Sequence, residues 1–178
     1  MPGADIVYGT SRKWIAGPRG VGFLAVRADS LRPVEIESSE AFIAGRIGLG
    51  VAVQELQSFG LERIHQELAA IGRFTRERLF GVGSWELMEP VDEKSAIATL
   101  APPPGWGRSD VLAAREKLRS RGILVTYADS WRAPLNSEQA VLRISPHLDV
   151  RREHLDRLAV ELRGMGYCCL LYTSDAAD

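Results

Sequence analysis

The amino-terminal part of the chain alternates short apolar runs with glycine-rich turns. Asp5 to Tyr8 (DIVY) and Phe23 to Val26 (FLAV) are apolar runs of strand length, and four glycines lie between positions 9 and 22. Glycine lets a backbone turn sharply or approach a ligand closely. The pattern predicts a buried strand, a glycine-punctuated loop and a second strand. A strand as short as DIVY needs neighbours, so we expect a preceding part of the protein to supply them.

Helical spacing dominates the next part of the chain. A helix is predicted over Glu40 to Phe59, with Ser38 and Ser39 as candidate N-caps. Its centre, AGRIGLGVAV, is apolar nearly all round and rich in small residues, which suits a helix that is buried or faces another subunit. After Gly60, a second helix is predicted because apolar residues recur at helical spacing: Leu61, Ile64, Leu68, Ile71 and Phe74.

From Ser84 onward the pattern changes to short strands and amphipathic helices. The predicted strands are Trp85 to Met88, Ser95 to Leu100, Ile123 to Tyr127 and Val141 to Ser145. The predicted helices are Asp110 to Ser120, capped by Ser109 and ended by Gly122, and about Arg151 to Arg163, which buries Leu155, Leu158 and Leu162. These elements predict a compact α+β unit of about three to four strands with helices on one face.

Composition and charge exclude several classes of protein. The 178 residues are 46% hydrophobic and 25% charged, with a formal net charge of −1, which allows one domain, or one plus part of another, with a real core. A basic stripe with interleaved aromatics is absent from the sequence, which argues against a nucleic-acid partner. No apolar run is long enough to span a membrane. Because MPGADIVYG lacks the order of a signal peptide, we expect a cytoplasmic protein.

The last residues differ in composition from the rest. The two cysteines of the chain, Cys168 and Cys169, are adjacent. Adjacent cysteines seldom pair, and two sulfurs without a nearby histidine make a poor zinc site, so we predict neither a disulfide nor a metal site. From Cys169 the chain runs CLLYTSDAAD, which is also the translation of DNA that resembles a transposase adapter used in sequencing libraries. We expect Cys169 to Asp178 to be an artefact of that kind.

Lys13 is the first candidate for chemistry. It lies beside Trp14, between an apolar strand and a glycine-rich loop. Burial of the amine there would make it lose its charge readily, which Schiff-base formation requires. The alternative is a solvated lysine with no chemical role, which is the usual state of this residue type.

The segment GTSRKWIAGPRGVGFLAVR resembles the cofactor-lysine segment of the class V aminotransferase and cysteine desulfurase family, pyridoxal-phosphate (PLP) enzymes of fold type I. In that family a strand leads into the lysine, an aromatic residue and a glycine–proline stretch. The resemblance implies that Lys13 carries PLP and moves the substrate Cα proton as base and acid. It also implies that Thr10 binds the cofactor phosphate. Many relatives have histidine before the lysine, where this chain has Arg12, which either neutralises phosphate or forms a surface salt bridge.

Arg143 is the second candidate. In the predicted strand VLRIS, a period of two puts Arg143 and Ser145 on one face, with Leu142 and Ile144 in the core. The pattern alone is equally compatible with an edge-strand arginine that faces water. LRISPH resembles the family's late R-x-S motif, in which an arginine holds the substrate α-carboxylate through its planar fork. The resemblance therefore implies Arg143 and Ser145 as substrate-binding residues, and His147 as either a lining residue or a turn histidine bonded to water.

The resemblance extends from about Asp5 to Gly166 and implies an architecture of mixed α/β and α+β type, the C-terminal part of a fold-type I PLP enzyme. Residues 1–59 would end the large PLP-binding domain, 60–168 would form the small C-terminal α+β domain, and 169–178 would be the artefact. A homodimer is implied as well. The segment Glu37 to Ala41 lacks the glycine and threonine of the family's inter-subunit phosphate turn. The family's upstream cofactor residues have no counterpart here, so we expect the chain alone to be inactive.

PLP supplies an electron sink, and the protein decides which bond breaks. A cysteine desulfurase needs a nucleophilic cysteine on a mobile loop, and the sequence between Tyr127 and Val141 contains none. SRKW, GPRGVG, GRIGL and LRISPH are most similar to hercynylcysteine sulfoxide lyase-like members, which serve ergothioneine biosynthesis. We therefore predict that the intact parent is a PLP-dependent C–S lyase acting by β-elimination on an amino acid such as a cysteine conjugate. The alternatives are a class V aminotransferase and a non-catalytic α+β binding or dimerisation module.

Overall fold

The computed structural model describes residues 4–30, 43–131 and 139–165. The chain divides into two compact units, Met1–Ile64 and His65–Asp178. The division falls within α2 (Leu61–Leu79), slightly later than the boundary predicted after residue 59. The predicted caps Ser38 and Ser39 and the expected artefact at 169–178 lie outside the described residues.

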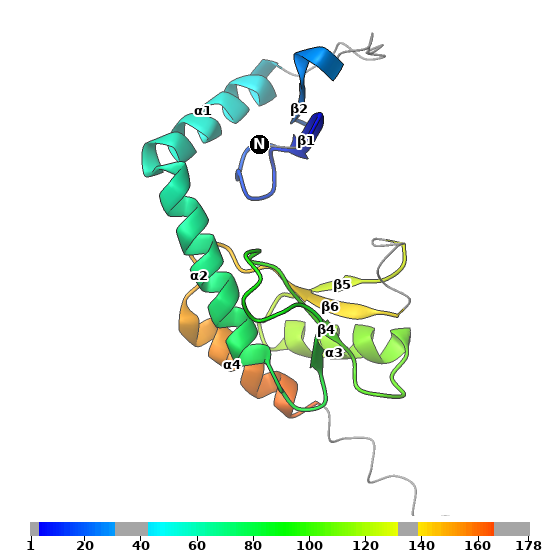
Figure 1. Cartoon of the computed structure of the whole chain (residues 1–178). Coiled ribbons are helices and arrows are strands. Elements are labelled where there is room, and N and C mark those ends of the chain that lie inside the picture. The colour runs from blue at the N-terminus through cyan, green and yellow to red at the C-terminus, as the bar shows by residue number, and fades with distance from the viewer. Residues whose placement is uncertain (1–3, 31–42, 132–138, 166–178) are drawn as a thin grey trace, which may run out of the picture. The chain divides into compact units, whose positions relative to one another are not determined.

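The first unit begins with the predicted strand, loop and strand, and the two strands form an antiparallel sheet. In it, β1 (Ile6–Thr10) pairs with β2 (Gly22–Val26), and Thr10 lies opposite Gly22 (Figure 1). A Cβ atom at Gly22 would lie 2.5 Å from the carbonyl oxygen of Gly9, so only glycine permits this approach of the two strands. The prediction that DIVY is buried is wrong for this chain, since Ile6 and Tyr8 are 57% and 81% exposed. Among the described residues β2 is the one strand that pairs with β1, and most residues of the pair are exposed.

The helix α1 (Ile43–Phe59) packs against the β1–β2 loop through small residues. Gly45 and Ala52 are buried, and a Cβ atom at Gly48 would lie 3.0 Å from Cγ of Pro18. The opposite side of the helix carries a stripe of exposed apolar residues at intervals of four: Ile43, Ile47 and Val51. Within this unit α1 is thus buried on one side only, and the expectation that it faces another subunit stays a prediction. Gly60, with a φ of +88°, separates α1 from α2.

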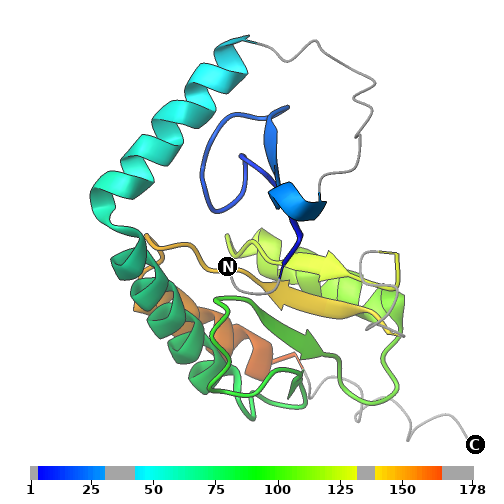
Figure 2. The ribbon, with the colours of Figure 1, turned by 45° about the horizontal axis from the view of Figure 1, so that its top comes forward.

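The second unit is built on a four-stranded antiparallel sheet with the order β3-β4-β6-β5 (Figure 2). Its strands are β3 (Glu86–Leu87), β4 (Ala98–Ala101), β5 (Thr126–Ala128) and β6 (Val141–Ile144). All of them are shorter than the apolar runs that predicted them. The predicted α+β unit of three to four strands is confirmed.

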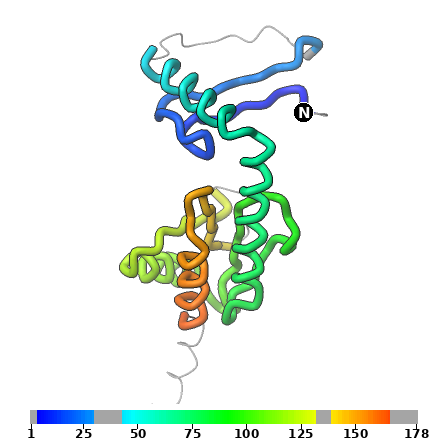
Figure 3. Tube along the Cα trace, turned by 90° about the vertical axis from the view of Figure 1, so that its left-hand side faces the viewer, coloured from blue at the N-terminus to red at the C-terminus, as the bar shows by residue number. Residues whose placement is uncertain are grey.

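Three helices cover one face of this sheet and close the core. These are the end of α2, α3 (Arg108–Ser120) and α4 (Arg152–Arg163), and α4 runs beside α2 (Figure 3). An ion pair of 2.9 Å between Arg78 and Asp156 joins these two helices. Leucines from every layer contribute to the core: Leu79, Leu100, Leu118, Leu142, Leu158 and Leu162. As predicted, α4 buries Leu155, Leu158 and Leu162.

The start of α3 differs from the prediction. The helix begins at Arg108 with Gly107 as its N-cap, so Ser109 lies inside the helix and does not cap it. The reason is that the Asp110 carboxylate, inside the first turn of the helix, accepts the Gly107 N–H at 2.7 Å. This bond fixes Gly107 as the first cap position. Gly122, with a φ of +76°, ends the helix as predicted.

A buried arginine fixes the segment that leads into β4. Arg76 on α2 is fully buried, and its guanidinium donates to the carbonyl oxygens of Val91 at 3.1 Å, Ser95 at 2.5 Å and Ile97 at 3.2 Å, and to that of Glu93. No sequence pattern singled out this residue. None of the helices in the described part of the chain is both long and apolar enough to cross a membrane.

Candidate functional site

Lys13 lies in a tight turn between β1 and β2. The Ala16 N–H donates to the Lys13 carbonyl oxygen at 2.9 Å, and Ala16 adopts a φ of +55°, which non-glycine residues rarely do. The side chains of Thr10, Arg12 and Lys13 are exposed. The expectation of a desolvated lysine is therefore wrong for this chain, since the described residues leave the Lys13 side chain open to solvent.

Ser11 closes the loop that carries Lys13. It is fully buried, and its hydroxyl donates to the carbonyl oxygen of Val21 at 2.9 Å and to that of Pro18, which share the single hydroxyl hydrogen. Its carbonyl oxygen accepts the Gly17 N–H at 2.8 Å. Sequence reasoning missed Ser11, although a small hydroxyl residue between Thr10 and the lysine was a possible signal.

The turn carries side chains that can bind an anion next to the Lys13 amine. Thr10, Arg12 and Lys13 come from neighbouring positions at the end of β1. A hydroxyl and a guanidinium are good donors to phosphate oxygens. The exposed amine can react with a carbonyl compound, and the hydrogen bonds of Ser11 hold its backbone in place.

Arg143 lies on an inner strand, not on an edge. It sits on β6, which has β4 on one side and β5 on the other, directly opposite Thr99 and Thr126. Leu142 and Ile144 point into the core, as predicted. The alternative of an edge-strand arginine is therefore wrong.

The Arg143 guanidinium has an unused donor. Its Nε atom is buried and has no hydrogen-bond partner among the described residues. Leaving a buried donor unpaired costs about 1–3 kcal/mol, so such a group calls for an explanation. A bound carboxylate would satisfy it, because a guanidinium matches a carboxylate through two parallel hydrogen bonds.

Ser145 and His147 lie beyond the end of β6 and are exposed. Ser145 lines a cavity of about 290 Å³ together with Ile123, His154 and Leu158, and Arg143 does not line this cavity. His147 Nδ1 lies 3.2 Å from a carboxylate oxygen of Asp149. The structure thus brings Arg143 together with two threonines, whereas Ser145 faces a different hollow. Lys13 and Arg143 belong to different units.

A polar cluster around Asp129 follows β5. The Asp129 carboxylate accepts the Tyr127 hydroxyl at 2.9 Å and the Trp131 N–H at 3.1 Å, and lies 3.9 Å from the Arg108 guanidinium. Burial and the hydrogen bond to Asp129 raise the pKa of the Tyr127 phenol. Sequence reasoning missed this cluster, since Tyr127 and Trp131 lie two residues from Asp129 along the chain but Arg108 comes from α3.

The chain is similar in sequence to one curated protein in particular, the probable hercynylcysteine sulfoxide lyase of Mycobacterium tuberculosis. The two are 43% identical over 178 residues, which covers 90% of this chain and 44% of the relative. The chain therefore spans less than half the length of that relative. No protein-family model matches the sequence.

Solved structures share the fold at lower identity. The apo cysteine desulfurase of Thermococcus onnurineus matches with a TM-score of 0.71 and 20% identity over 91% of this chain and 47% of its own. The cystine C–S lyase C-DES, in complex with cysteine persulfide, matches with a TM-score of 0.70 and 19% identity over 86% of this chain and 45% of its own.

This chain has the C-terminal fold of a fold-type I PLP enzyme. The resemblance to the class V aminotransferase and cysteine desulfurase family is confirmed. The chain covers 45% to 47% of the length of these two structures.

Proposed function

We propose that the intact protein is a PLP-dependent C–S lyase that acts on a cysteine conjugate by β-elimination, with hercynylcysteine sulfoxide as the first candidate substrate. The observation that carries this proposal is the 43% identity to a probable hercynylcysteine sulfoxide lyase. The fold shared with a cystine C–S lyase supports the same class of reaction.

The residues of the Lys13 turn fit PLP. In one structure of C-DES, glycine is covalently linked to the PLP cofactor. In this chain the exposed Lys13 amine would hold the cofactor, and Thr10 and Arg12 would bind its phosphate. When bound, PLP supplies an electron sink that weakens the bonds at the substrate Cα. The Ser11 bonds keep the Lys13 backbone in one position for this task.

Lys13 and Arg143 have separate parts in the proposed reaction. Arg143 binds the substrate α-carboxylate, which pairs its buried Nε donor. The Lys13 amine accepts the Cα proton, the Cβ–S bond breaks, and the sulfur leaves with the rest of the conjugate. Water then releases the remaining three-carbon fragment as pyruvate and ammonia. A persulfide-forming desulfurase is disfavoured, because the sequence between Tyr127 and Val141 has no cysteine.

We further propose that the intact protein is a cytoplasmic homodimer. The exposed apolar stripe of Ile43, Ile47 and Val51 on α1 supports a partner surface. Sedimentation of the full-length protein as a monomer at micromolar concentration would contradict the dimer.

The test uses full-length protein and measures pyruvate and ammonia released from cysteine S-conjugates. We expect Lys13→Ala to abolish release and Arg143→Lys to raise KM at least about tenfold, because a lysine lacks the two-pronged fork. Arg119→Lys, on the solvent side of α3, is the matched control and should keep both constants.

Two other outcomes would each favour one of the alternatives. Amino-group exchange with a keto acid, without release of pyruvate, would identify an aminotransferase. Indifference to PLP, with no change in the variant Lys13→Ala, would identify a non-catalytic module.

A further inference from the structure

The second unit has a hollow at the end of its sheet where β5 begins and β6 ends. Because these strands are antiparallel, with Thr126 opposite Arg143, the residues before β5 and the residues after β6 lie at the same end of the sheet. Together with α4 they line a cavity of about 290 Å³, which we call the α4 hollow. Its size is at the lower end of the range of small-molecule sites.

The walls of the α4 hollow are largely apolar and its charges have one sign. The apolar side chains come from the segment before β5, from the end of β6 and from α4: Ile123, Val125, Ile144, Leu155 and Leu158. The polar ones are Ser145, His154 and Arg157, and no carboxylate is among the described residues that line the hollow. Such a lining suits an apolar molecule that carries a negative charge, because a cation would find no carboxylate there.

Arg157 is held in position while its charge stays uncompensated. Its Nη2 atom donates to the carbonyl oxygen of Arg121 at 2.5 Å. The neighbouring carboxylates of α4 are engaged elsewhere, Asp156 with Arg78 and Glu161 with Arg121. A guanidinium has five N–H donors, so most of those of Arg157 remain for a ligand.

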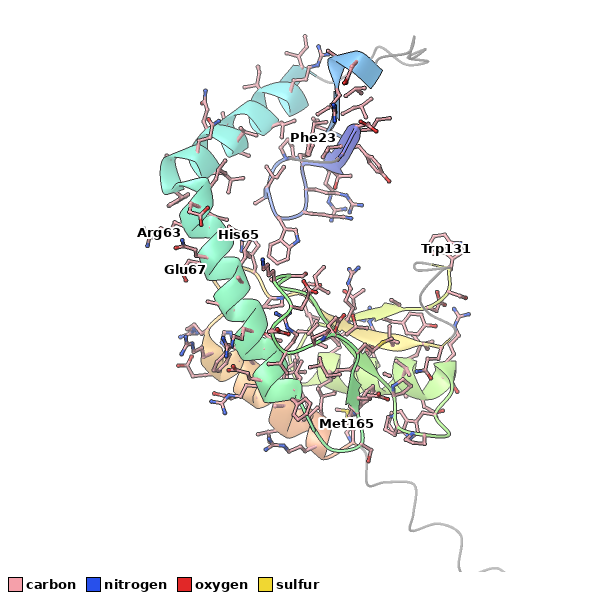
Figure 4. All side chains as sticks on the ribbon, in the orientation of Figure 1. Phe23, Arg63, His65, Glu67, Trp131 and Met165 are labelled. Atoms are coloured by element: carbon pink, nitrogen blue, oxygen red, sulfur yellow. The ribbon has the colours of Figure 1, made fainter. Side chains whose placement is uncertain are left out.

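His154 adds a second polar group from the same helix. Its ring makes no hydrogen bond or ion pair with any described residue. It lies one turn before Leu158, which is buried in the floor of the hollow. Figure 4 shows α4 ending near Met165, with nitrogen-tipped side chains along the helix.

We infer that the α4 hollow binds a small monocarboxylate with an apolar body, such as a branched or aromatic carboxylic acid. The apolar body lies against Ile123 and Leu158. The carboxylate accepts hydrogen bonds from the planar fork of Arg157, with Ser145 and His154 as further donors. A doubly charged phosphate fits less well, because a largely apolar wall would strip its hydration with one guanidinium in return.

The α4 hollow is separate from the substrate site proposed around Arg143. Arg143 does not line it. Alternation along β6 puts Arg143 on the opposite face of the sheet from Leu142 and Ile144, and Ile144 lines the hollow. The inference therefore goes beyond the proposed lyase reaction and needs none of its steps.

The test measures binding to the full-length protein by titration calorimetry. The probe is 3-phenylpropionate, and 3-phenylpropanamide is its neutral isostere. We expect a Kd of about 1 mM for the acid and affinity at least about fivefold weaker for the amide. Arg157→Gln should abolish this difference. Arg163→Gln, which changes another exposed arginine of α4 outside the hollow, is the matched control and should keep it.

A second variant and a second site make the test decisive. Val150→Phe, which fills the hollow and leaves Arg157 in place, should abolish binding of both compounds, and urea unfolding checks that each variant is folded. Failure of the wild type to bind the acid would mean that the full-length protein fills the hollow itself and would overturn the inference, as would equal binding of acid and amide. Loss of binding in Arg143→Lys but not in Arg157→Gln would place the probe in the substrate site and overturn it as well. Because no pyruvate is measured, failure of the lyase reaction leaves these results unchanged.

Discussion

The Ser11 hydroxyl donates to the carbonyl oxygen of Val21 at 2.9 Å, and the Ser11 N–H donates to the same oxygen at 3.0 Å. Two donors from one residue thus tie the start of the Lys13 loop to its end. Because Lys13 itself is exposed, its placement depends on this closure and not on packing around its side chain.

We expect Ser11→Ala to destabilise the protein by about 1–3 kcal/mol, because the Pro18 carbonyl oxygen loses the hydroxyl donor and the Val21 carbonyl oxygen keeps only the backbone N–H of residue 11. It should also lower the amount of PLP bound, measured from the cofactor absorbance of the purified full-length enzyme. The control is Ser120→Ala, which removes an exposed hydroxyl bonded to a carbonyl of its own helix. Equal cofactor content in the two variants would contradict the role given to Ser11.

Arg76 should be one of the most sensitive residues of the second unit. Its replacement by alanine leaves the carbonyl oxygens around it without their donor, and hydrogen bonds to charged groups contribute about 1.5–3 kcal/mol each. We expect a loss of at least about 3 kcal/mol in urea unfolding. Arg73→Ala, one turn away in a solvent-exposed pair with Glu77, should change stability by less than about 0.5 kcal/mol. Similar effects of the two substitutions would refute a special contribution of Arg76.

Two helical glycines should respond to alanine with opposite signs. At Gly72 a Cβ atom would lie 2.4 Å from the carbonyl oxygen of Ser95, and relief of that overlap requires backbone shifts that cost about 1–3 kcal/mol. At Gly50 nothing lies within 4 Å, so alanine should stabilise α1 by about 0.5–1 kcal/mol through its helix propensity. Thermal unfolding of both variants tests the contrast, which fails if Gly72→Ala is neutral.

The raised pKa of Tyr127 predicts a pH dependence of stability. Burial and the bond to Asp129 hold the phenol protonated in the folded state above its ordinary value of 10.0. A folded pKa above the unfolded one gives stability that is complete below the unfolded pKa and is lost as the pH rises through the folded pKa. The wild type should therefore lose more stability than Tyr127→Phe between about pH 9 and about pH 11. Parallel curves for the two proteins in urea titrations would contradict this.

Much of the secondary structure could be predicted from local pattern. The helices α2 and α4 follow apolar spacing, Gly122 ends α3 because its backbone adopts a φ of +76°, and β1 and β2 flank a glycine-rich loop. The boundary of α3 was predicted wrongly, since Ser109 and Gly107 are both possible N-caps and the bond from the Gly107 N–H to Asp110 favours Gly107. Sequence alone could not decide between them.

The candidate site was predicted in part. Lys13 and Arg143 were found through resemblance, and their roles stay predictions that the proposed experiments test. Ser11, Thr99, Thr126 and Asp129 were missed, because their importance comes from partners in other elements.

The sequence by itself determined the elements and the two segments that carry the candidate chemistry, because helical period, strand alternation and glycine placement act between residues close along the chain. The tertiary structure decided which strand became internal, which arginine was buried and which tryptophan stayed in solvent. Strand order puts Arg143 between Thr99 and Thr126, and packing puts Arg76 against Val91 and Ile97. These neighbours are brought together by burial and pairing of distant segments, and such contacts leave no periodic trace in the sequence.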